Sequence, residues 1–374
     1  MRIAIDARMY GQEQCSGIGA YIKNLTDALF KLDQENEYFL FMREPEFSRF
    51  VSPNERVKKV LVAPRWYSYA EQFVLPFQFA KEKFDLIHYP HFNSPVFYCK
   101  KSVCTIHDLT PFHFPGHKMG SLIRRIGYRL VFNATVAKAR RILTVSDSTK
   151  KGIAETFGVP ECKIKTTHLG VDEIFRVPVK SDIINAVKDK YRITQPYIFF
   201  IGVWRNHKNI EGLIRAFEIL KEKYALPHQL VLGGREDLHY TKVRDQIEKS
   251  KFKNDIITTG FVSEEDLPAL YTGADLFCLP SFIEGFGLIA VEAQTCGTPV
   301  VSTSTSSMPE VLGDSALYFD PHSEEQMAEQ IKKVLSEIDL RAQLIAKGKE
   351  NASRFSWQKC AEQTLAIYRQ CLEK

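Results

Sequence analysis

The sequence lacks any apolar run that approaches the ~20 residues a membrane-spanning helix requires. Among the first residues, charges at Arg2, Asp6 and Arg8 interrupt the apolar stretch that a signal peptide would need. The eight cysteines are scattered along the chain and form no Cys-x-x-Cys pair. Scattered cysteines are typical of a reducing compartment, so we expect a cytoplasmic protein without a membrane span.

Metal and cofactor motifs are also missing. His113 and His117 have a metal-ligand spacing, but the intervening Pro-Gly dipeptide prevents a helical His-x3-His face, so we expect no zinc. The segment that leads to a helix at 20–32 is expected to be a loop, and it carries Gly17 and Gly19. These glycines lack the rest of the dinucleotide fingerprint, which argues against an NAD site. We therefore expect neither a metal nor another cofactor.

The length and composition suit a globular chain of two domains. The 374 residues are enough for two cores, and 44% apolar with 25% charged residues is typical of soluble proteins. Residues 1–170 carry a net charge of +9 and residues 171–374 a net charge of −4. This division indicates that only the first half meets an anionic partner. No nucleic-acid recognition module is present and the second half is acidic, which excludes nucleic acid.

Short apolar runs alternate with helical stripes along most of the chain. The runs predict buried parallel strands, and the alternation predicts sheets covered by helices on both faces. The pattern restarts after a punctuated segment at 175–181, and two further helices close the chain. We therefore expect an α/β fold of two Rossmann-like, doubly wound domains that bind ligands at the carboxyl ends of their strands. The expected strands are 2–6, 38–42, 57–62, 84–88, 102–106, 141–145, 163–167, 197–201, 230–232, 255–258, 274–280 and 299–302.

The stretch 274–302 carries the most informative pattern. An apolar strand at 274–280 is followed by a loop with glycines at 285 and 287. A helix at 288–296 follows, ended by Gly297, and the next strand begins at 299. Glu284 lies in the loop and Glu292 lies about one turn into the helix.

This arrangement restricts the chemistry of the two carboxylates. Backbone amides at the start of a helix attract phosphate. A carboxylate beside a phosphate is repelled, so Glu284 and Glu292 are better suited to accept hydrogen bonds from hydroxyl groups. A ligand that fits both kinds of group has a pyrophosphate with a diol on each side, one from a ribose and one from a hexose. Such a ligand is a nucleotide sugar. The alternative is an ordinary strand-to-helix turn, with a glutamate placed to interact with the helix dipole.

The motif Glu284-Gly-Phe-Gly-Leu, followed by Glu292, resembles the Glu-x7-Glu signature of retaining GT-B glycosyltransferases of family four. The resemblance implies that Glu284 contacts hydroxyls of the donor sugar and that Glu292 holds the nucleotide ribose. It places the expected loop with Gly17 and Gly19 under the donor phosphates and the acceptor. The donor-binding residues it implies are Gly17, Gly19, Arg205, Lys208, Val262, Glu284, Gly285, Phe286, Gly287, Leu288 and Glu292.

Further roles follow from the same resemblance. His107, at the end of a predicted strand, would lie near the transferred sugar, and Arg205 and Lys208 would stabilise the leaving nucleoside diphosphate. The alternative for His107 is a structural histidine whose hydrogen bonds are satisfied within a packed loop. The alternative for Arg205 and Lys208 is that both are ordinary solvated surface charges. The polar run 302–307 suits either the wall of the donor pocket or an ordinary loop. The implied domains are an acceptor-binding domain at 1–174, a donor-binding domain at 175–354, and a helix at 355–374 that crosses back to the first.

Residues 118–141 contain seven basic residues and no acidic one. Leu122, Ile123, Ile126 and Leu130 give this segment an apolar face at helical spacing. One interpretation is docking to an anionic membrane that presents a lipid-linked acceptor. The other is a core helix with a solvated basic face.

Together these features predict a metal-independent glycosyltransferase, cytoplasmic or peripheral on the inner face of the membrane. We expect it to transfer a hexose, with mannose from GDP-mannose as the first candidate, to a hydroxyl of a glycan or lipid-linked acceptor in cell-surface polysaccharide synthesis. Catalysis would involve His107, Glu284, Arg205 and Lys208. A sugar-phosphate synthase of the same fold is one alternative, and a non-catalytic binding protein that keeps the fold is another.

Overall fold

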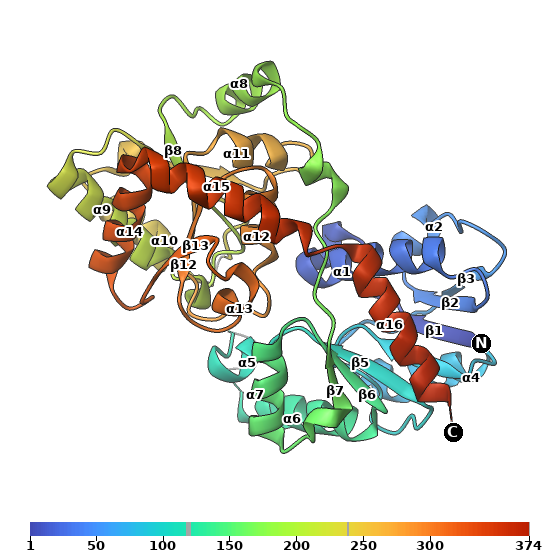
Figure 1. Cartoon of the computed structure of the whole chain (residues 1–374). Helices are drawn as coiled ribbons and strands as arrows, with labels where there is room; N and C mark the ends of the chain where they lie inside the picture. The colour runs from blue at the N-terminus through green and yellow to red at the C-terminus, as the bar shows by residue number, and fades with distance from the viewer. Residues whose placement is uncertain (117–120, 238, 374) are drawn as a thin grey trace. The chain divides into compact units, whose positions relative to one another are not determined.

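The structure, a computed structural model, describes residues 1–116, 121–237 and 239–373, with the backbone alone at 12–16. It divides into two compact units, which Figure 1 shows along the colour gradient. Unit 1 comprises Met1–Gly170 and Ser356–Lys374, and unit 2 comprises Val171–Phe355. The sequence placed the boundaries after residues 174 and 354. Phe175 packs edge-on against Tyr271, with ring centroids 5.8 Å apart, so the first residue of the punctuated segment 175–181 already belongs to the core of unit 2.

Unit 1 is built on a seven-stranded parallel sheet in the order β3-β2-β1-β4-β5-β6-β7. The strands are β1 (Arg2–Asp6), β2 (Glu37–Met42), β3 (Val57–Leu61), β4 (Leu86–Tyr89), β5 (Ser102–Ile106), β6 (Arg141–Thr144) and β7 (Ile164–Thr166). The helices are α1 (Gln12–Leu32), α2 (Glu46–Arg49), α3 (Tyr69–Phe73), α4 (Leu75–Ala80), α5 (Thr110–His113), α6 (Leu122–Lys138), α7 (Asp147–Phe157) and α16 (Trp357–Leu372).

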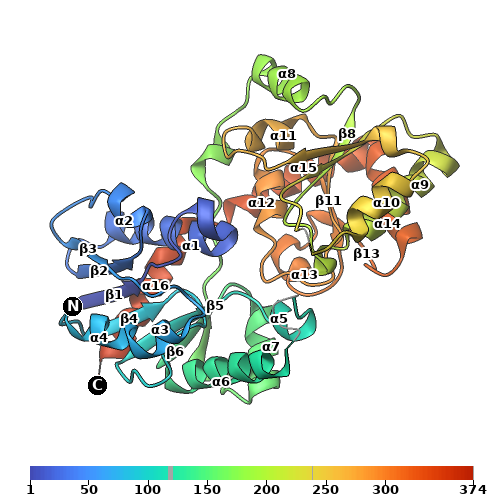
Figure 2. The same cartoon turned by 180° about the vertical axis from the view of Figure 1, so that it is seen from behind.

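Alternation along the strands explains why helices cover both faces of this sheet. Ile3 and Ile5 of β1 enter the core beneath α1 and α16, whereas Ala4 enters the core beneath α4. Successive side chains of a strand point to opposite faces, so an entirely apolar strand needs a helix on each side. Figure 1 shows α16 in front of the strands, and Figure 2 shows the opposite side of the sheet with α3 and α4.

The first helix begins earlier than the sequence predicted. The expected loop up to Gly19 is wrong, because α1 starts at Gln12 and includes both Gly17 and Gly19. Gly11 takes the positive φ of 88° at the helix start. A Cβ on Gly19 would lie 2.0 Å from the carbonyl oxygen of Gly11, so this glycine is required by close helix–loop packing.

Unit 2 is built on a six-stranded parallel sheet in the order β10-β9-β8-β11-β12-β13. The strands are β8 (Tyr197–Ile201), β9 (Gln229–Gly233), β10 (Ile256–Gly260), β11 (Leu276–Leu279), β12 (Val300–Thr303) and β13 (Ala316–Phe319). The helices are α8 (Ser181–Lys190), α9 (Ile210–Tyr224), α10 (Lys242–Lys249), α11 (Leu267–Gly273), α12 (Leu288–Thr295), α13 (Met308–Leu312), α14 (Glu324–Ser336) and α15 (Ile338–Ser353).

The predicted fold class is confirmed, with one strand missed. The expected two closing helices are wrong, since β13 and the helices α13 to α16 follow β12. The four residues of β13 lie between a turn at Gly313 and the Asp320-Pro321 dipeptide, and so short an apolar run cannot be told from a loop by its period.

A buried chain of hydroxyl and imidazole groups fastens α16 to the strands of unit 1. Tyr368 Oη lies 2.6 Å from His88 Nδ1, and His88 Nε2 lies 2.8 Å from Thr105 Oγ1. Thr105 Oγ1 in turn lies 3.0 Å from Tyr21 Oη. Burial lowers the pKa of His88 to about 3, so its ring is neutral and supplies one donor and one acceptor.

We expect Tyr368→Phe to destabilise unit 1, because it leaves the buried Nδ1 of His88 without its partner. An unsatisfied buried polar atom costs about 1–3 kcal/mol. The free energy of unfolding, measured by urea denaturation, checks this. Tyr69→Phe is the matched control, since Tyr69 is 87% exposed. Equal losses in the two variants would contradict the role of the buried chain.

Candidate active site

The candidate site of unit 2 lies where the sheet order reverses. β8 and β11 are neighbours, yet the chain leaves β8 toward β9 and leaves β11 toward β12. The connections after two such strands diverge and open a crevice at their carboxyl ends. Lys208 follows β8 and Glu284 follows β11, and Lys208 Nζ lies 2.6 Å from Glu284 Oε1. The structure therefore brings together two predicted site residues that are 76 positions apart in sequence.

The Glu284 carboxylate is stabilised as an anion. Its side chain is 12% exposed, and Ser281 Oγ donates a hydrogen bond of 2.7 Å to Oε1. Burial by itself would raise the pKa, but the charge of Lys208 and the hydrogen bonds from Lys208 and Ser281 hold the pKa of Glu284 below its usual value. A carboxylate that stays ionised in a nearly dry site is a strong acceptor for ligand hydroxyls.

The backbone of Glu284 is clamped by two serines. Ser306 Oγ donates to the Glu284 carbonyl at 2.6 Å and accepts from the Glu284 amide at 3.3 Å. Ser307 Oγ donates to the same carbonyl at 3.0 Å. Ser306 adopts a φ of 59°, a conformation that costs about 1–3 kcal/mol for a non-glycine residue and clusters at functional sites. Ser306 and Ser307 therefore position the Glu284 loop. For the run 302–307 the sequence had offered a wall of the donor pocket or an ordinary loop.

Helix α12 begins directly after this loop, and the Ala290 amide already donates to the Gly287 carbonyl at 2.9 Å. Its N-cap is Gly287, with a φ of 78° and no side-chain cap. The positive φ of Gly287 favours glycine, and a Cβ there would also displace the Met308 methyl group, 2.3 Å away. The first-turn amides of any helix lack intrahelical partners and attract anions. The predicted helix is confirmed, and Gly297, with a φ of 82°, follows its end.

Glu292, one turn into α12, has a different environment from Glu284. Tyr271 Oη donates a 3.0 Å hydrogen bond to its Oε2. Burial raises the pKa of Glu292 to about 7, and the charges of Asp172 and Glu264 add to the rise against the opposing effect of the Tyr271 hydrogen bond. No cation contributes to this pKa shift of Glu292. Near neutral pH the carboxyl group is therefore partly protonated and partly ionised.

Arg205 is not brought to the Lys208–Glu284 pair. Its Nε lies 3.3 Å from Asp237 Oδ2, and its side chain is 53% exposed. Asn209 is buried with a φ of 51° and donates to the carbonyls of Pro280 and Pro321 at 3.1 and 2.8 Å. It ties the loop after β8 to the end of β11, and so fixes where Lys208 lies.

The remaining predicted residues lie as follows. Val262, after β10, is buried, while the neighbouring Phe261 is 64% exposed beneath the guanidinium of Arg235, 4.7 Å from the ring centroid. In unit 1, His107 Nε2 donates to the Pro90 carbonyl at 2.9 Å, and the ring packs edge-on against Tyr21. Burial lowers the pKa of His107, which keeps its imidazole neutral.

Among the side chains that the structure describes, those of residues 1–11, 17–116, 121–237 and 239–373, no three from histidine, cysteine or carboxylate residues are placed to hold a metal ion. Over the same part of the chain, no helix has the length and apolar character needed to cross a membrane.

Two Rossmann-like units, the second with this site at its switch point, define the GT-B class of glycosyltransferases. Residues 15–174 match the family model described as Glycosyltransferase Family 4, and residues 184–351 match Glycosyl transferases group 1. HepE from Anabaena, solved with UDP and glucose, superimposes with a TM-score of 0.78 at 17% identity, over 99% of this chain and all of that one.

The sequence relatives agree. O-antigen chain mannosyltransferase B of Escherichia coli is 33% identical over 285 residues, 76% of this chain and 74% of that protein. Serotype-specific mannosyltransferase WbdA of Escherichia coli is 28% identical over 73% of this chain, which spans only 34% of that longer protein. The chain belongs to the group 1, family 4 glycosyltransferases. The predicted class, a nucleotide-sugar-dependent glycosyltransferase, is confirmed.

We expect the affinity for nucleoside diphosphates to rise between about pH 6 and pH 8. As Glu292 ionises through its pKa of about 7, it becomes a stronger acceptor for ribose hydroxyls. A hydrogen bond to a charged group exceeds a neutral one by about 1 kcal/mol, which is about fivefold in affinity. Calorimetric titration of UDP and GDP measures this, and Glu292→Gln should remove the part of the slope that Glu292 causes, leaving the part due to the terminal phosphate of the ligand, which titrates at about pH 6. An undiminished slope in the variant would show that another group titrates.

Proposed function

We propose that this glycosyltransferase moves mannose from GDP-mannose to a hydroxyl of a lipid-linked surface polysaccharide, with retention of the anomeric configuration. The observation that carries the proposal is the Lys208–Glu284 pair at the switch point of unit 2, beside the amide-bearing start of α12. The names of the two Escherichia coli relatives, both mannosyltransferases and one of an O-antigen chain, support mannose and a polysaccharide acceptor.

The proposed chemistry needs charge stabilisation more than a nucleophile. The bond from the sugar C1 to the phosphate oxygen breaks, the bond from C1 to the acceptor oxygen forms, and GDP leaves with extra negative charge. The ammonium of Lys208 has three donors, so it can contact Glu284 and a phosphate oxygen together. The α12 amides would add to this, and Glu284 would accept from sugar hydroxyls. In a same-face reaction the leaving phosphate takes the acceptor proton.

The roles of the other predicted residues remain part of the proposal. Glu292 would hold the ribose, Val262 would lie near the base, and the backbone of residues 285–288 would meet the phosphates. Arg205 would have to give up its ion pair with Asp237 in order to bind a phosphate group. His107 would orient the transferred sugar. Gly17 and Gly19 would lie under the donor phosphates and the acceptor. No metal or other cofactor enters this scheme.

We expect Lys208→Met to lower kcat for mannose transfer about 10²–10³-fold, the usual cost of removing one group that stabilises transition-state charge. Release of GDP from GDP-mannose, in the presence of lipid-linked acceptor, measures the rate. Lys251→Met is the matched control, because Lys251 is 82% exposed and pairs with Glu222, which is not a predicted site residue. Unchanged turnover in Lys208→Met would refute the assigned role. A wild-type chain that binds GDP-mannose without turnover would favour the scaffold alternative, and transfer to a soluble sugar phosphate the synthase alternative.

We also propose that unit 1 docks on an anionic membrane through α6. Its apolar face does not enter the core, since Leu122 and Ile123 are 70% and 80% exposed, and Ile126 and Leu130 are exposed as well. The core-helix interpretation is therefore wrong for these four residues, although the second half of α6 does pack inward. Residues 118–120 of the basic segment lie outside the described residues.

Charge and neighbouring aromatics support a lipid partner. Arg124, Arg125 and Arg129 are exposed on the same half of α6. Tyr89 and Cys104, paired in register, belong to the cores beneath α4 and α6, so both helices cover one face of the sheet. On that face the aromatics of α3 and α4 are also exposed, namely Tyr69, Phe73 and Phe77. Exposed apolar side chains among cations fit an anionic bilayer surface.

Replacing Arg124, Arg125 and Arg129 with glutamine should weaken binding to anionic vesicles about a hundredfold, at about 1 kcal/mol for each charge. Flotation with phosphatidylglycerol vesicles measures this. Leu122→Ser with Ile123→Ser should also reduce binding, whereas Ile338→Ser, at an 84% exposed position of unit 2, should not. Equal flotation of all variants would exclude docking through α6.

A further inference from the structure

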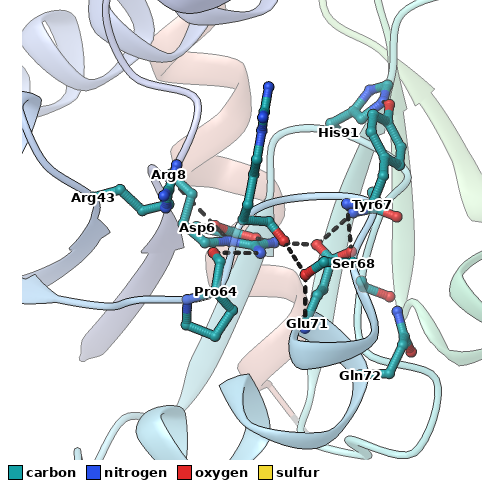
Figure 3. A network of polar contacts seen from close by, with 12 residues as sticks. Asp6, Arg8, Arg43, Pro64, Tyr67, Ser68, Glu71, Gln72 and His91 are labelled. Atoms are coloured by element: carbon teal, nitrogen blue, oxygen red, sulfur yellow. Dashed lines mark hydrogen bonds and ion pairs between the residues drawn. The ribbon is translucent and has the colours of Figure 1, made fainter.

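Four cations of unit 1 lie at the start of the neighbouring strands β5, β6 and β7. They are Lys101, Arg140, Arg141 and Lys165, which together we call the strand-start patch. Arg141 is half-buried and the other three are exposed. Among the side chains that the structure describes, no carboxylate forms an ion pair with any of the four. By contrast, Arg8, which follows β1, is held between the carboxylates of Asp6 and Glu71 (Figure 3).

The pairing of the strands places three of these cations on one face of the sheet. Arg141 is in register with Val103, and Lys165 is in register with Leu143. Val103 and Leu143 both belong to the core beneath α1 and α16. Residues in register on neighbouring strands share a face, and Lys101 lies two positions before Val103. Lys101, Arg141 and Lys165 are therefore on the face that α16 partly covers.

The end of α16 holds the fourth cation at the same place. Arg140 Nη1 donates to the Cys371 carbonyl at 3.1 Å. Burial raises the pKa of the Cys371 thiol, and the nearby charges of Arg141, Arg140 and Lys101 oppose that rise. These three cations therefore surround the last turn of α16. The partial negative charge of a helix end offsets only part of the charge of Arg140.

The carboxylates of the neighbouring segments leave the patch positive. They are Asp85, Glu161, Glu362 and Glu373. Asp85 accepts a hydrogen bond of 2.8 Å from the Arg2 amide. Glu161 pairs with Lys150 at 3.3 Å, and Glu362 accepts a hydrogen bond of 2.9 Å from Gln358. Of these four carboxylates, Glu373, exposed after the end of α16, is the one left to oppose four cations.

We infer that the strand-start patch is a docking surface for an acidic segment of another protein. Adjacent cations without carboxylate partners attract a ligand that carries several negative charges. None of the described residues of β5, β6, β7 and α16 is an exposed large apolar side chain, so ion pairs would form the contact. The guanidinium of Arg141 has unused donor capacity, since its Nε has no hydrogen-bond partner among the described residues.

The two faces of the sheet distinguish a protein from a bilayer as the partner. α6 covers the face of Cys104, whereas the patch is on the face of Val103, the preceding residue of β5. A membrane bound through α6 would therefore lie on the side away from the patch, which would be open to soluble partners. This choice of partner rests on the proposed docking through α6. Nucleic-acid bases stack on exposed aromatic rings, and these strands and α16 expose none among their described residues.

The test uses a fluorescent oligoglutamate peptide as the probe, and its binding to the full chain is measured by fluorescence anisotropy at low salt. Replacing Lys101, Arg141 and Lys165 with glutamine should weaken binding about tenfold, because each exposed ion pair contributes about a factor of two. Arg140 stays in place because it caps α16. The double variant at the exposed Lys101 and Lys165, which keeps the half-buried arginine, should weaken binding about fourfold.

The matched control is the α6 variant with glutamine at Arg124, Arg125 and Arg129, which removes the same charge from the same unit. It should leave peptide binding almost unchanged. Equal peptide binding by the patch and α6 variants, or no peptide binding by the wild type, would overturn the inference. Tighter binding of a single-stranded oligonucleotide than of the peptide would overturn it as well.

Flotation with phosphatidylglycerol vesicles separates this inference from the proposed docking. The patch variant should float like the wild type, whereas the α6 variant should float less. Loss of flotation in the patch variant would assign these cations to the bilayer and overturn the inference. Undiminished flotation of the α6 variant would refute the docking proposal and leave the patch to be judged on the peptide data.

Discussion

The divergence of the chain at the carboxyl ends of two neighbouring parallel strands is the constraint on which this molecule depends. Hydrogen-bonded strands lie side by side whatever their distance in sequence, so the residues that follow them must meet. In unit 2 this places the cation of Lys208 against the carboxylate of Glu284. In unit 1 it places Asp6 and Arg8 against His91 and Asn93. Each polar cluster is thus positioned by the sheet rather than by local sequence.

Neighbouring side chains determine whether each carboxyl group of the donor site is ionised. Glu284 and Glu292 are eight positions apart and both are largely enclosed, yet their pKa values move in opposite directions. Lys208 and Ser281 keep Glu284 charged, whereas Glu292 has the Tyr271 hydroxyl and two distant carboxylates around it. One group is therefore a fixed anion and the other is close to half-ionised near neutral pH. A single motif supplies two chemically different acceptors because the surrounding helices differ.

Sequence reasoning succeeded where a pattern is local. Glu284, Glu292 and the glycine that ends α12 were found by spacing, since strand, loop and helix each leave a periodic trace. It failed where a partner comes from elsewhere in the chain. The sequence predicted a loop at Gly19. A glycine is needed there because the residue packs against the Gly11 carbonyl, a contact that the local sequence does not reveal. Likewise nothing in the sequence pairs Arg205 with Asp237, or Ser306 with the backbone of Glu284.

The charges of unit 1 bear on which acceptor the chain can use. A sugar phosphate would bring at least one negative charge to unit 1, where Asp6 and Glu71 already outnumber Arg8. Burial raises the pKa of Glu71 despite the arginine. Arg43 and Arg65 add cations beside this cluster, since both guanidinium groups lie over the Trp66 ring. The charge of this cluster therefore does not distinguish the two acceptors. What favours a lipid-linked glycan over a soluble sugar phosphate is α6, where exposed arginines lie beside exposed aliphatic side chains, as an anionic lipid surface requires.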